Sequence, residues 1–497
     1  MIYLLRQLLL TILLFSLTVL NGQQEKINWG PELKGEGIVA LFGEVENHLY
    51  ATRVKINGFK PKISILKIDK TTLQIVEEKK VKKLLDGNIP VHTTMVEDQV
   101  HVLILSDKVL SNVVFDLELN EVSNVVFKQL DNDANILPPY MSDENPLIPG
   151  DIISSIESRD KNKVAIKITK PGKKKVDIEY HVFDTKQGYK HMYSTDLVLD
   201  KKETLEIIKD TDLLQDGSLN ILVKQYNNKK GKEFKNKKPD YNFTILKLGI
   251  NGEVKEIDLP NQKEFWKGPK ISHNIDGAIL VSAMSQNKPK GGATGFHIIK
   301  IGADNKLIFE KTHPLKNNDE KDKLHKSYGV SDFITINDNL SIIISENGIV
   351  RNFNVKGMTP NSKFSSDDVL LDGFDAEGNH IWSKRIYRNA TENGMAKMFS
   401  SLFAFYNDEG LSIHYNTTEK NTRTLNSEKQ KGEKLPNKKN VIVKAKLALD
   451  GSLSFHKVSS GNKLNFWPQV TRMYGESIYF LGAEDSWMKE MTIGVVK

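Results

Sequence analysis

The chain has 497 residues, with 70 Lys and Arg against 63 Asp and Glu, so its net charge is +7. Hydrophobic residues make up 39% of it, which is enough for a sizeable core and excludes global disorder. It has no cysteine, which excludes disulfides, Cys-ligated zinc, iron–sulfur clusters and thiol nucleophiles. The length predicts roughly three domains, unless one large all-β domain holds most of the chain.

Residues 1–22 are predicted to be a signal peptide. Arg6 supplies a positive start, Leu8–Leu20 is uncharged and apolar, and Gly22 is a small residue at the expected cleavage point. The apolar run is short for a hydrocarbon core of about 30 Å. We therefore expect a mature chain that begins near Gln23 and is periplasmic or extracellular, with no transmembrane segment after cleavage. The alternative is an uncleaved anchor.

Strand-type alternation recurs along the rest of the chain in a fixed order. Apolar runs flank tight-turn pairs such as Asn251-Gly252 and Asp450-Gly451, which are the strongest short hairpin signal. The second strand of each unit is expected to begin at eight positions, about 61 residues apart on average: Asn47, Gln99, Lys163, Ser218, Gly277, Asn339, Gly410 and Glu476.

Four antiparallel strands in each repeated unit predict an all-β fold, a β-propeller, with eight blades preferred and seven as the alternative. Residues 23–497 would form this single domain. We expect Glu25–Trp29 to pair with Met491–Val496 and close the ring. Separate β-sandwiches would also show short strands and turns. In this general form the chain resembles exported β-propeller proteins of Gram-negative bacteria, although it has none of the named blade signatures.

Long polar segments fall mainly between the second and third strands of the units, which predicts that one face carries the loops. The five segments have a net charge of +16, so the rest of the chain is at −9; they are Pro171–Lys175, Asn227–Asp240, Gln286–Ala293, Asn347–Ser365 and Thr418–Asn440. Such a face would attract an acidic glycan or an acidic protein. We single out Lys229, Lys230, Lys237 and Lys238 as binding residues. The open alternative is that these lysines only keep the protein soluble.

Two aromatic pairs, Phe265-Trp266 and Phe466-Trp467, precede predicted inner strands. Trp266 and Trp467 would then lie near the mouth of the central channel, where rings can stack on a sugar or clamp a peptide. Packing between blades is the alternative. The polar loops lack interleaved aromatic residues, so we expect no nucleic acid as a partner.

Motifs for catalysis or cofactor binding are absent, and we expect no cofactor. Asp131, Asp133 and Asn135 begin like a calcium loop, but Ile136 stands where that loop needs glycine and Ser142 where it needs glutamate. We therefore expect no metal site and regard these three residues as a weak calcium candidate.

The sequence favours a binding or scaffold protein, because that class needs no catalytic residues. The alternative is a carbohydrate-active hydrolase or lyase with its site at the channel mouth, which would need two carboxylates about 5–10 Å apart. Asp151, Asp332 and Glu264 are candidates near inner strands. A convergent pair of carboxylates without a cationic partner would favour the enzyme, and an apolar channel would exclude it.

Overall fold

The protein is seen here as a computed structural model. It describes residues 26–33, 37–57, 60–80, 89–106, 108–132, 134–136, 151–172, 174–200, 205–260, 263–274, 276–289, 291–315, 328–337, 339–353, 361–388, 390–393, 401–407, 410–425, 433–435, 439–462, 464–484 and 491–496. The predicted signal peptide lies outside these ranges. Within the described ranges no helix is long and apolar enough to cross a membrane.

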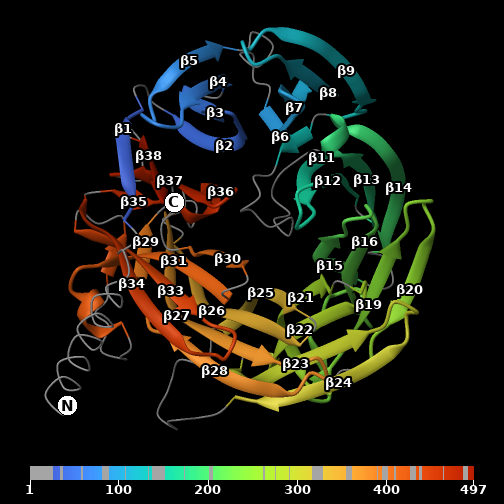
Figure 1. Ribbon diagram of the computed structural model, residues 1–497. Helices are drawn as coiled ribbons and strands as arrows, with labels where there is room; N and C mark the ends of the chain where they lie inside the picture. The colour runs from blue at the N-terminus through green and yellow to red at the C-terminus, as the bar shows by residue number, and fades with distance from the viewer. Residues whose placement is uncertain are drawn as a thin grey trace, which may run out of the picture.

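Antiparallel sheets of mostly four strands follow one another around a central opening (Figure 1). We letter the strands of each blade A to D from the centre outwards. The first four blades are β2 (Ile38–Val45), β3 (His48–Asn57), β4 (Lys60–Asp69) and β5 (Ile75–Lys80); β6 (Ile89–Val96), β7 (Gln99–Ser106), β8 (Val109–Phe115) and β9 (Glu121–Gln129); β11 (Asp151–Glu157), β12 (Lys163–Pro171), β13 (Lys175–Asp184) and β14 (Lys190–Asp200); and β15 (Leu205–Leu213), β16 (Leu219–Tyr226), β19 (Tyr241–Leu248) and β20 (Val254–Asp258).

The other four blades complete the ring. They are β21 (Phe265–His273), β22 (Ile279–Gln286), β23 (Ala293–Ile301) and β24 (Leu307–Pro314); β25 (Tyr328–Asn337), β26 (Leu340–Phe353), β27 (Asn361–Phe374) and β28 (His380–Ile386); β30 (Phe403–Asn407), β31 (Gly410–Thr418), β33 (Asn440–Leu447) and β34 (Leu453–Asn462); and β36 (Arg472–Tyr474), β37 (Ser477–Ala483), β38 (Met491–Val496) and β1 (Asn28–Glu32). The prediction of an all-β, eight-bladed propeller is confirmed.

Burial explains which strand takes which place in a blade. All eight residues of β22 are buried, because a B strand is covered by a neighbouring blade on each side. The outer strand β24 alternates between exposed and half-buried residues along most of its length, because only one of its faces meets protein. Sequence runs that are apolar throughout therefore become inner strands, and runs that alternate become outer ones.

Short elements join neighbouring blades. β10 (Ala134–Ile136) pairs in parallel with β11, and β35 (Asn465–Phe466) pairs antiparallel with β37. β29 (Ala390–Asn393) runs antiparallel to β27 and parallel to β32 (Glu433–Leu435). Three 3-10 helices are present in the described ranges: η2 (Thr185–Gln187), η4 (Asn421–Thr424) and η5 (Pro468–Val470). The predicted polar loop Asn347–Ser365 needs correction, since β26 and β27 extend into it and stay paired from Gly348↔Ser366 to Phe353↔Asn361.

The last blade combines the two ends of the described chain. β1 runs antiparallel to β38, with Asn28 opposite Val495 and Trp29 opposite Gly494, and the two strands lie side by side in Figure 1. The Thr492 hydroxyl also donates to the carbonyl of Gly30 at 2.8 Å. The expected partner of β38 was Glu25–Trp29, and the observed strand lies three residues further along the chain. The pairing gives each of the two strands a partner along an edge whose backbone groups would otherwise be unpaired.

Candidate functional site

The segment 227–240 of blade 4 lies between β16 and β19 and carries the four lysines that the sequence singled out. It folds as a hairpin of β17 (Phe234–Lys235) and β18 (Lys238–Pro239). Asn236 and Lys237 form its tip with positive φ angles of 52° and 64°, the conformation of a tight hairpin turn. Its base is closed by a hydrogen bond of 3.1 Å from the Asn227 amide to the Asp240 carbonyl. The hairpin is therefore an ordered element.

The acidic and basic side chains of this hairpin point in different directions. Glu233 accepts hydrogen bonds from Lys224 at 2.7 Å and the Tyr226 hydroxyl at 2.6 Å, and Asp240 accepts one from Asn228 at 2.9 Å. The lysines are exposed, and no ion pair joins them to another residue that the structure describes; they are Lys229, Lys230, Lys232, Lys235, Lys237 and Lys238. Because both carboxylates are engaged within the blade, the fully exposed charges of the hairpin are those of its lysines.

On the side of the ring where the hairpin 227–240 lies, strand pairing joins neighbouring connections. β32, from the long connection within blade 7, runs parallel to β29, which itself pairs with the extended end of β27 in blade 6. Leu435 of β32 is buried in the same apolar cluster as Ala390 of β29. We call this side of the ring, formed by the B–C and D–A connections, the loop face. The A–B and C–D turns form the turn face; for example, the Lys70 amide donates to the Asn47 carbonyl at 2.8 Å.

Neither predicted aromatic residue lies on an accessible surface. Trp266 is 7% exposed and stacks on Phe243, with ring centroids 4.8 Å apart and an interplanar angle of 16°; its other neighbour is His297. Trp467 is 3% exposed and belongs to an apolar cluster with residues of blade 1. Both rings pack between elements of the ring, which agrees with the alternative of packing between blades and not with stacking on a ligand.

The weak calcium candidate is not assembled by the residues that the structure describes. The side chain of Asp131 is 86% exposed and lies 3.7 Å from Lys170. Asp133 lies outside the described residues, and nothing is described of the Asn135 side chain beyond its place in β10. In the described ranges, no group of three or more His, Asp or Glu residues is arranged to hold a metal ion.

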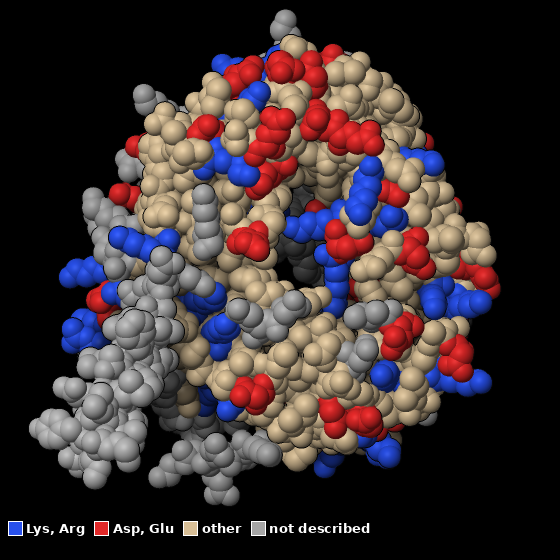
Figure 2. All heavy atoms as spheres, in the orientation of Figure 1, with Lys and Arg blue, Asp and Glu red and all other residues tan. Residues whose placement is uncertain are grey.

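The inner strands share an irregularity that the sequence did not reveal. In five of the A strands the register shifts by one residue or more, as in a β-bulge, and the residues that follow the shift are Gly43, His92, Asp210, Lys270 and Asp332. A bulge re-aims the side chain that follows it. Gly43 has no side chain, and the other four residues are polar. His92 contacts Glu157 of β11, and Asp210 contacts Lys270, so these contacts join inner strands of different blades. Lys and Arg side chains gather at the edge of the opening, over β11 and β15 (Figure 2).

On blades 3 to 6 the channel is lined by charged groups of both signs. The Lys270 ammonium lies 3.2 Å from Asp210, and His273 lies 2.6 Å from Asp212. The Arg159 guanidinium reaches from the β11–β12 turn to the Ser272 hydroxyl and to the Phe333 carbonyl, the latter at 2.8 Å. Asp332 faces the water of the channel, yet enclosure by protein raises the pKa of its carboxyl, an effect that the charge of Arg159 partly opposes.

A second group lines the channel on blades 2, 3 and 8. His92 bridges the buried Tyr189 hydroxyl, 2.5 Å from its Nδ1, and Glu157, 2.6 Å from its Nε2. Enclosure raises the pKa of Glu157, but the hydrogen bond with His92 and the positive charges of Arg472 and Lys161 outweigh it and lower that pKa to about 2. Glu157 is therefore an anion at neutral pH, and 44% of its side chain is accessible to water.

The three carboxylates that the sequence predicted near the inner strands lie in different environments. Asp332 lies in the channel, Glu264 precedes β21 with one carboxylate oxygen buried, and the Asp151 side chain lies outside the description. The carboxylates that face the channel on blades 4 and 6 are Asp210, Asp212 and Asp332. Each has a basic side chain beside it: Lys270, His273 and Arg159, respectively. The channel is therefore neither apolar nor built around a carboxylate pair without cations.

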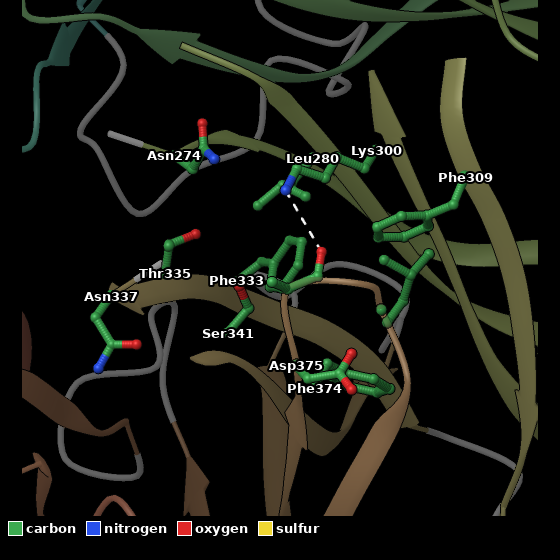
Figure 3. A pocket seen from close by; sticks show the side chains of 13 residues that line it. Asn274, Leu280, Lys300, Phe309, Phe333, Thr335, Asn337, Ser341, Phe374 and Asp375 are labelled. Atoms are coloured by element: carbon green, nitrogen blue, oxygen red, sulfur yellow. Dashed lines mark hydrogen bonds between the residues drawn. The ribbon is translucent and has the colours of Figure 1, made fainter. Parts of the chain in front are cut away.

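A small pocket opens between blades 5 and 6 (Figure 3). Lys300 donates to the carbonyl of Ala376 across it at 3.4 Å, and the rings of Phe309, Phe333 and Phe374 line it. Its one carboxylate, Asp375, accepts hydrogen bonds from the amide and side chain of Asn379, at 2.7 and 2.9 Å. The pocket therefore offers a ligand few polar groups that are not already engaged.

Comparisons with known proteins give no family for this chain. No family model matches the chain, and no curated protein matches it. Among solved structures, the polysaccharide lyase Uly1 is similar over 96% of this chain and 93% of its own, at 12% identity and a TM-score of 0.39. Chaetomium thermophilum Sqt1, solved with the N-terminus of ribosomal protein L10, is similar over 95% and 99%, at 9% identity and a TM-score of 0.42. These values are too low to carry an argument about function.

Proposed function

We propose that this propeller is a binding protein whose loop face holds an acidic polymer, with the hairpin 227–240 as its main contact. The observation that carries the proposal is the arrangement of charge in the hairpin. Its two carboxylates are engaged by Lys224, Tyr226 and Asn228, while its lysines face solvent. An ordered array of unpaired cations attracts a polyanion and loses little entropy when it binds.

The order of the hairpin distinguishes this proposal from a solubilising role. Lysines that only keep a protein soluble can stand on any flexible loop, and their backbone needs no fixed geometry. Here the tip adopts a tight turn, and the Asn228 side chain accepts hydrogen bonds from the amides of Lys230 and Lys232 at 3.2 and 2.9 Å. Phe234 is 54% exposed beside the lysines and offers an apolar contact to the same ligand. An acidic glycan is the ligand class that we favour.

Replacing Lys229, Lys230, Lys237 and Lys238 by Ser tests the proposal. We expect the affinity for polygalacturonate, measured by isothermal titration calorimetry at low ionic strength, to fall by about tenfold. The difference between parent and variant should shrink at physiological salt, where exposed charges are screened beyond about 8 Å. The melting temperature should not change, because these side chains make no core contact.

A matched control places the same loss of charge on the turn face. Lys186, Lys190, Lys255 and Lys306 are exposed there, at or beside C–D turns, and replacing these four by Ser also removes four positive charges. We expect this variant to bind the polymer as the parent does. Equal weakening in both variants would show that only net charge matters, and it would overturn the assignment of binding to the hairpin.

A further inference from the structure

The outer strand of blade 2, β9, is exposed on both of its faces. The first six of its nine residues are exposed, whereas β5 and β24 alternate between exposed and half-buried residues along most of their length. Three of the six are valines, Val122, Val125 and Val126, which are 55%, 50% and 61% exposed. The strand therefore carries apolar β-branched surface that its own blade does not cover.

The outer edge of β9 is open to a further strand. Among the strands that the structure describes, only β8 pairs with β9, which lies on the rim of the ring (Figure 1). Its two bulges, at Val122 and Phe127, lie towards the ends, and Ser123–Val126 between them keep a regular ladder with β8. The second edge of such a ladder is a template for another strand.

The middle of β9 has no charge to prevent such pairing. Residues 122–127 read Val-Ser-Asn-Val-Val-Phe. Charged side chains on an edge strand discourage association with another edge. Four other outer strands each carry two adjacent charges: Glu77-Glu78 in β5, Lys255-Glu256 in β20, Glu310-Lys311 in β24 and Lys384-Arg385 in β28. This contrast distinguishes β9 as an edge that is suited to pairing.

The two charged residues beside this uncharged run favour a second copy in one orientation. Glu121 precedes the run and Lys128 follows it. Two antiparallel copies bring the Glu121 end of each strand beside the Lys128 end of the other, whereas parallel copies would set like charges together. Lys128 also lies 3.0 Å from Glu179 of blade 3, so Glu121 of the second copy would join an existing ion pair.

Val125 is the midpoint of the strand. It lies opposite Asn112, in the fourth of the seven registered pairs that run from Val109↔Gln129 to Phe115↔Glu121. A two-fold axis at Val125 therefore pairs the greatest length of β9 with its copy. It also brings the two Val125 side chains together.

We propose that two copies of this protein associate through antiparallel pairing of their β9 strands, about a two-fold axis at Val125. One short strand from each copy makes a small contact, so we expect a weak dimer with a dissociation constant in the micromolar range. The contact lies on the outer rim of blade 2 and goes beyond the proposed function. A failure of polymer binding at the hairpin 227–240 would leave it intact.

Disulfide trapping tests the contact directly, because the chain has no cysteine of its own. Val125→Cys introduces a single thiol, and the two-fold axis sets two such thiols close enough to bond. Oxidation with diamide should convert most of this variant to a covalent dimer on a non-reducing gel. Ile308→Cys in β24, a similarly exposed residue of another outer strand, is the control and should stay mostly monomeric.

Sedimentation velocity tests the chain without a thiol. The sedimentation coefficient of the parent should rise with concentration from that of a monomer towards that of a dimer. Val125→Lys should stay monomeric, because it sets two like charges side by side at the axis. Ile308→Lys is the matched control and should associate as the parent does. Both residues are exposed, so neither variant should change the melting temperature.

Three outcomes would overturn the proposal. The first is a parent chain that remains monomeric up to millimolar concentration, which would leave the edge of β9 to a different partner. The second is equal trapping of Val125→Cys and Ile308→Cys, which would indicate random collision. The third is a dimer that survives Val125→Lys, because association would then use another surface.

Discussion

His414 in β31 shows how individual residues set the pH response of this fold. It is fully buried, and neither ring nitrogen has a hydrogen-bond partner among the described residues. Its ring stacks on Phe405, with centroids 5.8 Å apart, and meets Phe480 edge-on. Burial, with a smaller effect of Lys444, lowers the pKa of His414 to about 3, so the folded protein holds it neutral.

This depressed pKa predicts a pH-dependent gain from His414→Phe. An unfolded histidine titrates near 6.5, so acid favours the unfolded parent as pH falls from that value towards 3. At pH 5 the variant should gain about 2 kcal/mol in unfolding free energy relative to its gain at pH 8. Urea denaturation at both pH values measures this difference.

His456→Phe is the matched control, since His456 lies in the same blade but is exposed. It should show no such difference between pH 5 and pH 8. An equal gain for His414→Phe at the two pH values would mean that His414 is not held neutral by the fold.

At the scale of elements, the closure of the ring depends on one strand pair. Gly482 in β37 and Gly494 in β38 leave the space in which the Trp29 ring of β1 lies, because a Cβ atom at either position would overlap that ring. The Trp29 indole also donates to Ser459 of blade 7 at 3.4 Å. β1 is thus fitted to two neighbouring strands and to the preceding blade.

Gly494→Ala should therefore displace β1 and lower the unfolding free energy by about 1–3 kcal/mol, a range typical of overpacked cores. Gly329→Ala in β25 is the control, because its Cβ would meet nothing closer than 4.0 Å. In a chain without residues 26–33 the Gly494→Ala change should cost nothing further. An undiminished cost in that shortened chain would show that the alanine acts elsewhere than on β1.

The repeat of strand pairs is a property that sequence reveals well. Turn pairs such as Asp450-Gly451 and continuous apolar runs predicted the blades, because tight turns and double-sided burial restrict residue types strongly. The bulges before His92, Asp210, Lys270 and Asp332 could not be predicted. A bulge changes the strand register by only one residue. Its position cannot be predicted, because single polar residues also occur in inner strands without a bulge.

The sequence also could not predict which residues from different blades come into contact in the closed ring. Arg159 and Phe333 are 174 residues apart, and only the closed ring of eight blades brings them together. At Trp266, an aromatic residue near a predicted strand end was consistent with a ligand contact or with packing between blades, and the sequence could not decide between the two. The structure packs it against Phe243, because large rings fill the space between blades as readily as they line a channel mouth.

At the scale of the whole molecule, the ring separates two kinds of surface. The loop face carries the cationic hairpin 227–240, and the turn face carries short turns and the channel end with Arg159, Lys161 and Arg472. A propeller suits such a division, because every blade sends the same connections to the same side. Residues on one face can therefore be altered without changing the other face.

Hydrogen–deuterium exchange with and without polygalacturonate tests most directly whether the hairpin of blade 4 contacts an acidic polymer. At low ionic strength the amides of residues 227–240 should exchange more slowly when the polymer is bound, and this protection should vanish in the four-lysine variant. Unchanged exchange in residues 227–240 at a polymer concentration that saturates the protein would contradict the account.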